Sequence, residues 1–448
     1  MRKYLIYILL LLPWAAFAQT PVTLAECLAL GEENTPALRN AQLDIQSAKA
    51  LKSELVWSYF PNVSVRSFGF WSRDPLLDVG LSDIIGDSRA ALIINDGAEY
   101  IAGKLEIPTR VQAFHYGWGV AASAIQPLFA GGRIINGNKL ASVGVKAAEV
   151  QYDMQLRDKR REIEEGYWQV VSLQEKSRTL AAVQATVDSL CRTVAAARKA
   201  GLVPESDLTV VQLQQKRLSA AAVTLRGGIR LAKINLFNTI GKSYAYLDLD
   251  QYVFADAVEP LPRPLEPAGD AASPESALLF MQVEAKRLEK QVQIGEFLPQ
   301  VGIGAGYGYS QFQGPRDPGT SLLAFATVKI PLTGIGQAVS RARRYDAALQ
   351  KARNDQAYNE AQLALLERKL HLEMDTAWEQ AQILREAWQV AEDGSRRSRA
   401  DWKAGRISLA DYLRTTVDAR QAHEAYLDQC LVYRRAYSAY AARYAAPR

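Results

Sequence analysis

The chain has 448 residues, 48% of them hydrophobic, and its 53 Lys and Arg against 48 Asp and Glu leave a formal net charge of +5. The length suits two or three ordinary domains. A charge this small for the size argues against a nucleic-acid-binding surface or a polybasic membrane tether, so we expect no nucleic-acid partner.

The first residues have the pattern of a secretory signal peptide, assigned to residues 1–18. A basic start, MRK, precedes a short apolar run, and the tripeptide AFA ending at Ala18 has the small residues of a cleavage site. The run is about half of the roughly 20 residues that a spanning helix needs, and no later segment is long enough either. We expect an exported protein without transmembrane helices.

The chain repeats itself once. Pro331 follows Pro127 by 204 residues, and KAGRISLADYL follows the similar KAGLVPESDL at the same distance. Upstream, Pro299 in FLPQVGI follows Pro61 in YFPNVSV by 238 residues, so the first copy carries 34 additional residues between its strand-like segments. Two copies of one unit that differ in one loop predict a duplicated architecture.

Two stretches without proline predict very long helices. No proline occurs between Pro127 and Pro204 or between Pro331 and Pro447, and proline breaks helix interiors. Each stretch allows a helix of roughly 70 residues, about 100 Å long, which indicates coiled-coil packing. Two shorter helices placed end to end match one long helix, which suggests the wall of a cylinder.

The strand-like segments alternate in hydrophobicity. WGVAASAIQPL and LLAFATVKIPL each have one apolar face, which begins at Trp118 and Leu322, and one mixed face, which includes Ser123 and Lys329. Such segments of about ten residues are typical of transmembrane β-strands. In PQVGIGAGYGYS every second residue from 302 to 308 is glycine. This spacing does not match the nucleotide-binding G-x-G-x-x-G motif and indicates a face that lines a narrow lumen.

Counting strands predicts the assembly. Four strands cannot close, and an open edge in lipid leaves backbone groups unsatisfied at several kcal/mol each. Two chains would give eight strands around a filled interior, whereas three chains give twelve strands and room for a lumen. We therefore predict a homotrimer of mainly α-helical chains, with a long coiled-coil tunnel and a 12-stranded transmembrane β-barrel.

The segments follow from these patterns. The first repeat, 19–242, has a helix, a strand at 59–72, an extracellular loop at 73–115, a strand at 116–129, a long helix at 132–200 and a return helix at 206–241. The second, 275–448, has a helix, strands at 299–312 and 321–332, a long helix at 336–403 and a return helix at 408–445. The Pro-rich equatorial segment 243–274 is either a flexible linker or an ordered strap.

The residues of common catalytic and metal sites are few and scattered. Cys27, Cys191 and Cys430 are odd in number and far apart, which excludes a disulfide framework, and we interpret them as core residues. The three histidines have no metal-ligand or triad spacing. Glu-rich segments such as RREIEEGYW are interpreted as solvated faces. We predict no enzyme, no metal and no cofactor.

Over essentially all of residues 19–448, the sequence resembles the TolC-like outer-membrane efflux proteins. LAECLALGEENTPALRNAQLDIQSAKA resembles that family's opening helix, and QPLFAGGR and AGLVPESDL resemble its best-marked internal motifs. The resemblance implies a trimer in the lipid of the cell outer membrane that extends into the periplasm. It also implies passive conduction in multidrug efflux or type I secretion, with a periplasmic adaptor (membrane fusion) protein and an inner-membrane RND, ABC or MFS transporter as partners.

By the same resemblance, the breaks between long and return helices are periplasmic tips. Asp207 and Asp411 begin the return helices, where an acid either favours the helix dipole or forms a ring at the entrance. Arg414 stands where the family often has a second acid, which weakens the expectation of a cation-selective gate. Trp402 and Arg406 stand where contacts to the neighbouring helix pair are expected. The expected adaptor contacts are Gly201, Leu202, Val203, Gly405 and Ile407.

The junctions between strand and long helix are expected to turn the chain from barrel to tunnel. In the first repeat Pro127 ends the strand, and Gly131 and Gly132 let the chain swivel. In the second repeat the same role falls to Pro331, Gly334 and Gly336.

Two questions of function stay open in the sequence. The alternative to a channel is a periplasmic coiled-coil adaptor or scaffold, which would not explain the duplicated strand pairs. The loop at 73–115 either forms a second constriction or covers the surface.

Overall fold

The computed structural model divides into two compact units, which are described separately. The helical unit comprises Met1–Ser47, Lys146–Gln282 and Asn354–Arg448, and the sheet unit comprises Ala48–Val145 and Val283–Arg353. The structure describes residues 20–80, 110–113, 115–242, 252–254, 256–266, 273–312, 318–331 and 334–444. The predicted signal peptide lies outside these residues, as do most of the predicted extracellular loop and parts of the predicted linker.

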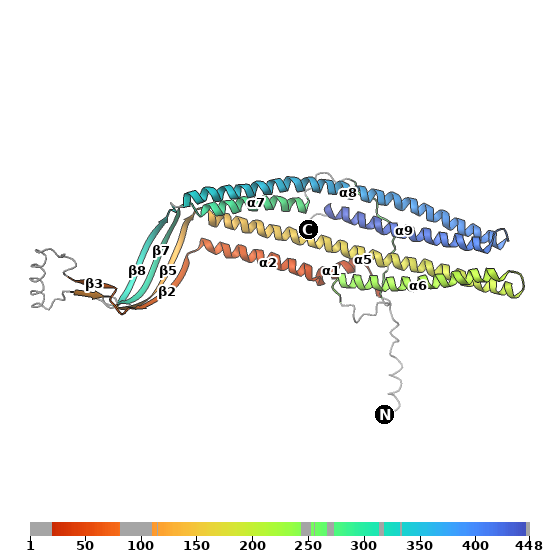
Figure 1. Ribbon diagram of the computed structural model, residues 1–448, viewed down its shortest axis with the longest axis horizontal. Coiled ribbons are helices and arrows are strands. Elements are labelled where there is room, and N and C mark those ends of the chain that lie inside the picture. The colour runs from red at the N-terminus through yellow and green to blue at the C-terminus, as the bar shows by residue number, and fades with distance from the viewer. Residues whose placement is uncertain are drawn as a thin grey trace, which may run out of the picture. The chain divides into compact units, whose positions relative to one another are not determined.

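Four antiparallel strands form the sheet unit, in the order β2-β5-β7-β8 (Figure 1). Their bounds are β2 Asn62–Trp71, β5 Tyr116–Ala130, β7 Gln300–Phe312 and β8 Gly319–Lys329. The expectation that Pro127 ends its strand was wrong, because β5 continues to Ala130 and its register with β7 shifts between Pro127 and Phe129. A bulge accommodates a residue that cannot donate to the ladder.

The register gives the sheet two different faces, as the alternation predicted. One, named here the apolar face, carries Val63, Val65, Trp118, Val120, Ala122, Ala124, Ile303, Tyr307, Tyr309, Leu322, Ala324 and Val328. The other, named the glycine face, carries Ser64, Arg66, Phe68, Phe70, Gly117, Gly119, Ala121, Ser123, Ile125, Gly302, Gly304, Gly306, Gly308, Phe312, Ser321, Leu323, Phe325 and Lys329. Cross-strand partners share a face because side chains alternate along each strand.

Two hairpins of long helices dominate the fold (Figure 1). Helix α5 (Arg133–Lys199, 67 residues) leads into α6 (Glu205–Thr239), and α8 (Ile335–Lys403, 69 residues) leads into α9 (Leu409–Tyr444). None contains proline, so the backbone hydrogen bonds run without a break. Of the helices that the structure describes, none is long and apolar enough to span a membrane.

Shorter helices precede the strands. They are α1 (Leu24–Asn34), α2 (Pro36–Val56), the 3-10 turn η1 (Trp57–Tyr59) and α7 (Pro274–Gly295). The opening helix is thus divided between α1 and α2, because Thr35 is extended, with ψ 122°. A residue before proline disfavours the helical region, and Pro36 can begin a helix but not continue one.

Two short strand pairs were not expected from the sequence. Strand β1 (Thr20–Val22) pairs in parallel with β6 (Tyr252–Phe254), and β3 (Leu77–Gly80) pairs antiparallel with β4 (Arg110–Ala113). The second pair lies within the segment that we predicted to be an extracellular loop. Both pairs join segments far apart in sequence, which local propensity does not show.

The described part of the Pro-rich linker, residues 256–266, is an ordered strap. Val258 is fully buried, and the backbone carbonyl of Val258 accepts a hydrogen bond from Arg434 at 3.2 Å. Tyr433 donates to the Pro262 carbonyl at 2.6 Å, and Tyr167 donates to the Asp256 carboxylate at 2.6 Å. The strap is therefore fixed to α5 and α9 of the helical unit.

At the first junction in the sheet unit, both glycines have left-handed backbone conformations. Gly131 has φ +63° and Gly132 has φ +77°. A Cβ on Gly131 would lie 2.1 Å from the Gly295 carbonyl oxygen, so α7 and the junction touch backbone to backbone. At the second junction a Cβ on Gly334 would lie 2.7 Å from the Phe297 ring, whereas Gly336 has open space around it. Sterics therefore require glycine at three of the four predicted positions.

We expect Gly131→Ala to lower the free energy of unfolding by at least about 2 kcal/mol, from left-handed strain plus the clash with Gly295. Gly144→Ala is the control, since Gly144 lies in α5 with nothing within 4 Å of an added Cβ. It is expected to be neutral or to stabilise the helix by up to about 1 kcal/mol. Thermal unfolding followed by circular dichroism distinguishes the two, and equal midpoints would contradict the packing described.

Candidate functional site

The tips of the two helix hairpins have the same turn. After α5, Gly201 has φ +74°, and the Leu202 amide donates to the Ala197 carbonyl at 2.9 Å. After α8, Gly405 has φ +70°, and the Arg406 amide donates to the Asp401 carbonyl at 2.9 Å. This pattern is the Schellman motif, which places glycine after the last helical residue and satisfies the terminal carbonyls. The duplicated motif KAG therefore has a backbone cause.

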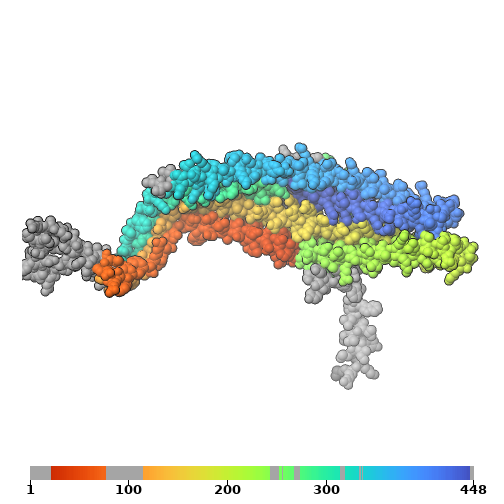
Figure 2. Space-filling view, viewed as in Figure 1, coloured from red at the N-terminus to blue at the C-terminus, as the bar shows by residue number. Residues whose placement is uncertain are grey.

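The two tips share one hydrophobic cluster. Its buried members come from α5, α6 and α9, and Trp402, Ile407 and Val203 pack against them. The buried residues are Leu180, Val187, Leu190, Val194, Val211, Leu218, Leu409, Tyr412 and Leu413. In the space-filling view the green surface of α6 adjoins the blue surface of α9 (Figure 2). Movement at one tip therefore disturbs the packing of the other.

At the second tip, polar contacts are made within the same hairpin. Arg406 forms an ion pair with Asp401. The Ser408 hydroxyl donates to the Asp411 carboxylate at 2.6 Å and accepts the Asp411 amide at 3.1 Å, which caps α9. Trp402 stacks on Tyr412, with ring centroids 5.5 Å apart. Within one chain, then, Arg406 holds its own turn, and Trp402 joins the cluster common to both hairpins.

The first tip differs in its caps and in its exposed apolar group. The residue before α6 is Pro204, which provides no side-chain cap, and an ion pair of 2.7 Å joins Arg198 to Glu205 across the turn. Asp207 is half-buried in the first turn of α6, whereas Asp411 and Arg414 are exposed on α9. Leu202, an apolar side chain, is 77% exposed.

The sheet presents a second candidate site. Several side chains of its apolar face are largely exposed, among them Val63 at 70% and Leu322 at 77%. Among the described strands, β2 and β8 each pair on one side only. An exposed apolar face beside unpaired strand edges is typical of a binding surface.

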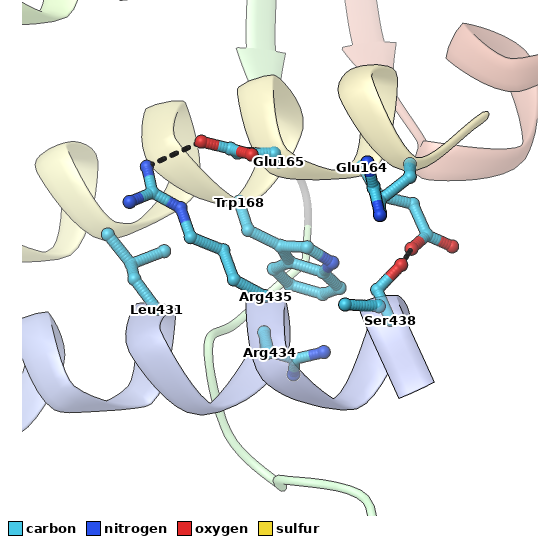
Figure 3. Close-up of a pocket in the computed structure, with 9 residues that line it drawn as sticks. Glu164, Glu165, Trp168, Leu431, Arg434, Arg435 and Ser438 are labelled. Atoms are coloured by element: carbon cyan, nitrogen blue, oxygen red, sulfur yellow. Dashed lines mark hydrogen bonds and ion pairs between the residues drawn. The ribbon is translucent and has the colours of Figure 1, made fainter. Parts of the chain in front are cut away.

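A pocket between α5 and α9 of the helical unit has a volume of about 210 Å³. The Arg434 guanidinium lies 3.5 Å from the centre of the Trp168 ring (Figure 3). An ion pair of 2.8 Å links Arg435 to Glu165, and Ser438 donates to Glu164. The segment RREIEEGYW is thus not simply a solvated face, since Glu164 and Glu165 bind α9. These polar groups are paired internally: Arg434 binds the strap, and Arg435 and Ser438 join α9 to α5, so none is presented as a reactive group.

The cysteines and acidic residues do not form a chemical site in the described part of the chain. Burial raises the pKa of Cys27 to about 12 and that of Cys430 to about 11, so both thiols stay protonated in the core. Cys191 is partly buried against the tip cluster. No group of three or more His, Cys, Asp or Glu among those residues is placed to hold a metal ion.

Sequence reasoning missed several residues of these sites. Ser408 had a local signal, since S-x-x-D before an apolar run is typical of a helix start. Gly295 and Arg434 had none, because their contacts come from residues far away in sequence, 176 positions in the case of Arg434 and Val258.

The fold is that of known outer-membrane channels. A membrane protein from Pseudomonas aeruginosa superposes with a TM-score of 0.74 and 14% identity over 94% of this chain and 89% of its own. The CmeC outer membrane channel of Campylobacter jejuni superposes with a TM-score of 0.71 and 12% identity, over 94% of this chain and 85% of its own. The outer membrane protein VceC of Vibrio cholerae superposes with a TM-score of 0.71 and 13% identity, over 94% of this chain and 95% of its own.

No family model matches the sequence, and no curated protein matches it either. Identities of 12–14% establish a common fold and no more. The predicted fold class, long helices with four strands per chain, is thereby confirmed, as is the resemblance to TolC-like proteins at the level of fold. Closure into a trimeric barrel stays a prediction.

We expect Ser408→Ala to lower local stability at the start of α9 by about 1 kcal/mol, because the Asp411 amide loses the Ser408 hydroxyl that accepts its hydrogen bond. Amides of the first turn of α9 should then exchange with solvent roughly fivefold faster. Ser206→Ala is the control, because Ser206 lies in the first turn of α6, where no side-chain cap is formed. Exchange that is equally fast in the wild type and Ser408→Ala would show that the cap is not formed in solution.

Proposed function

We propose that three copies of the chain form an outer-membrane channel that passively conducts substrates out of the cell. In this proposal a periplasmic adaptor and an inner-membrane transporter deliver the substrate, in efflux or type I secretion. The observation that carries it is the four-stranded sheet, with one exposed apolar face and two unpaired edges, in a chain that has the fold of outer-membrane channels.

The edges favour closure by further copies. In lipid, each unpaired backbone group costs several kcal/mol, so β2 of one chain pairs with β8 of the next until no edge is left. Three chains give twelve strands, which leave a lumen, whereas eight strands are filled by side chains. The apolar face then meets lipid and the glycine face lines the bore.

The hairpin tips are the natural place for the gate and for the adaptor. Three copies would bring three Asp411 carboxylates to one entrance, where a ring of acids favours cations. Leu202, exposed at the first tip, offers the apolar contact that an adaptor needs. The shared cluster beneath the tips would transmit an opening of one hairpin to the other.

Single-channel recording in planar bilayers tests the proposal. Purified mature protein should give discrete conductance steps and remain trimeric in detergent. Protein that stays in the aqueous phase and gives no steps would favour the alternative, a periplasmic coiled-coil adaptor or scaffold.

We expect Arg406→Ala to raise the resting conductance, because the turn loses its ion pair with Asp401. Asp411→Asn should weaken cation selectivity at the same entrance. Arg287→Ala, which breaks an exposed ion pair with Glu284 within α7 and not at a tip, is the control and should leave the resting conductance nearly unchanged. An unchanged conductance in Arg406→Ala would remove Arg406 from the gate.

A further inference from the structure

The four strands of the sheet contain only two charged side chains, Arg66 on β2 and Lys329 at the end of β8. The register places both on the glycine face. No acidic residue occurs in these strands, so the face is uniformly positive.

Arg66 has space around it. Across the sheet its row continues through Ala121, Gly308 and Ser321. A Cβ added to Gly308 would lie 2.8 Å from the Ala121 Cβ, so the backbones are close and no side chain rises between them. The exposed Arg66 side chain therefore lies beside a strip of small residues on this face.

Aromatic rings occupy the same face beyond Arg66, towards the end of β2. The Phe68 and Phe312 rings are stacked with centroids 5.8 Å apart, and Phe70 lies 6.3 Å from Phe312. These rings cover Gly117 and Gly119, where an added Cβ would lie 2.5 and 2.9 Å from a ring atom. Covering strand glycines is a stabilising role, yet Phe68 remains 51% exposed.

We propose that Arg66 and Phe68 form a binding site for aromatic carboxylates on the glycine face. The guanidinium pairs with the carboxylate through two parallel hydrogen bonds, and the ring of the ligand packs against Phe68. The inference rests on the proposed function, because it is closure into a channel that makes this face a lumen. Three copies would place three Arg66 and three Lys329 around one bore, and rings of Arg or Lys select anions.

The first test is ion selectivity in a salt gradient across a planar bilayer. Arg66→Gln should shift the reversal potential towards cations relative to the wild type, more at low salt, where the Debye length is longer. Arg66→Lys keeps the charge and should leave the reversal potential nearly unchanged. If Arg66→Gln gives conductance steps of normal size with the same reversal potential as the wild type, the inference is overturned. The proposed channel function would not be affected by that result.

The second test uses benzoate as the probe and acetate as its non-aromatic counterpart. Benzoate should block chloride current at lower concentration than acetate, and Phe68→Leu should weaken the benzoate block roughly 2- to 10-fold without changing the acetate block. Phe325→Leu is the matched control, because Phe325 lies on the same face in the row of Gly304. Equal block by the two anions would overturn the site, and absence of any channel would overturn the proposed function with it.

Discussion

The structure depends above all on the need to pair the backbone of the sheet. Four strands satisfy their inner hydrogen bonds and leave β2 and β8 open along one side. In the proposed channel these edges would meet lipid, where each unpaired backbone group costs several kcal/mol. The apolar face, the small residues of the opposite face and the tight junctions at Gly131 and Gly334 all suit closure of this sheet with copies of itself.

The long helices α5 and α8, of 67 and 69 residues, must also be kept in register with the helices beside them. Coiled helices of this length can slide or fray, and little in their surface prevents it. Three devices hold them: the Schellman turns at the tips, the common cluster below the tips, and the strap of residues 256–266. Buried tyrosines such as Tyr167 and Tyr433 anchor the strap through their hydroxyl groups.

Much of this fold could be predicted from the sequence, because its strongest features are local and repeated. Absence of proline predicts the long helices, alternation predicts the two faces of the sheet, and K-A-G marks both hairpin turns. Non-local contacts could not be predicted in this way. No sequence periodicity connects the residues that make these contacts. Examples are the pairing of β1 with β6, the close contact of Gly295 with Gly131, and the hydrogen bond from Arg434 to the Val258 carbonyl.

For the candidate sites, the sequence marked the tips and the junctions but left some contacts undetermined. Within the chain Arg406 pairs with Asp401 of its own turn, and the contact expected with a neighbouring helix pair stays a prediction. Side-chain partners at a tip depend on a turn geometry that the sequence specifies only in part. Gly336 was predicted to let the chain swivel at the second junction, yet an added Cβ there would meet open space, so its surroundings do not require glycine.

Arg66 on the sheet and Asp411 at the tip carry opposite charges, and their surroundings differ. Asp411 is exposed, already accepts a hydrogen bond from Ser408, and is followed one turn later by Arg414. Its field is screened by solvent beyond about one Debye length. Arg66 lies on a face without a single acid in its four strands, and a narrow bore between low-dielectric walls strengthens such a charge. In the proposed channel the Asp411 ring at the tip therefore favours cations only weakly, whereas the Arg66 ring in the bore has the stronger effect on which ions pass once the tip is open.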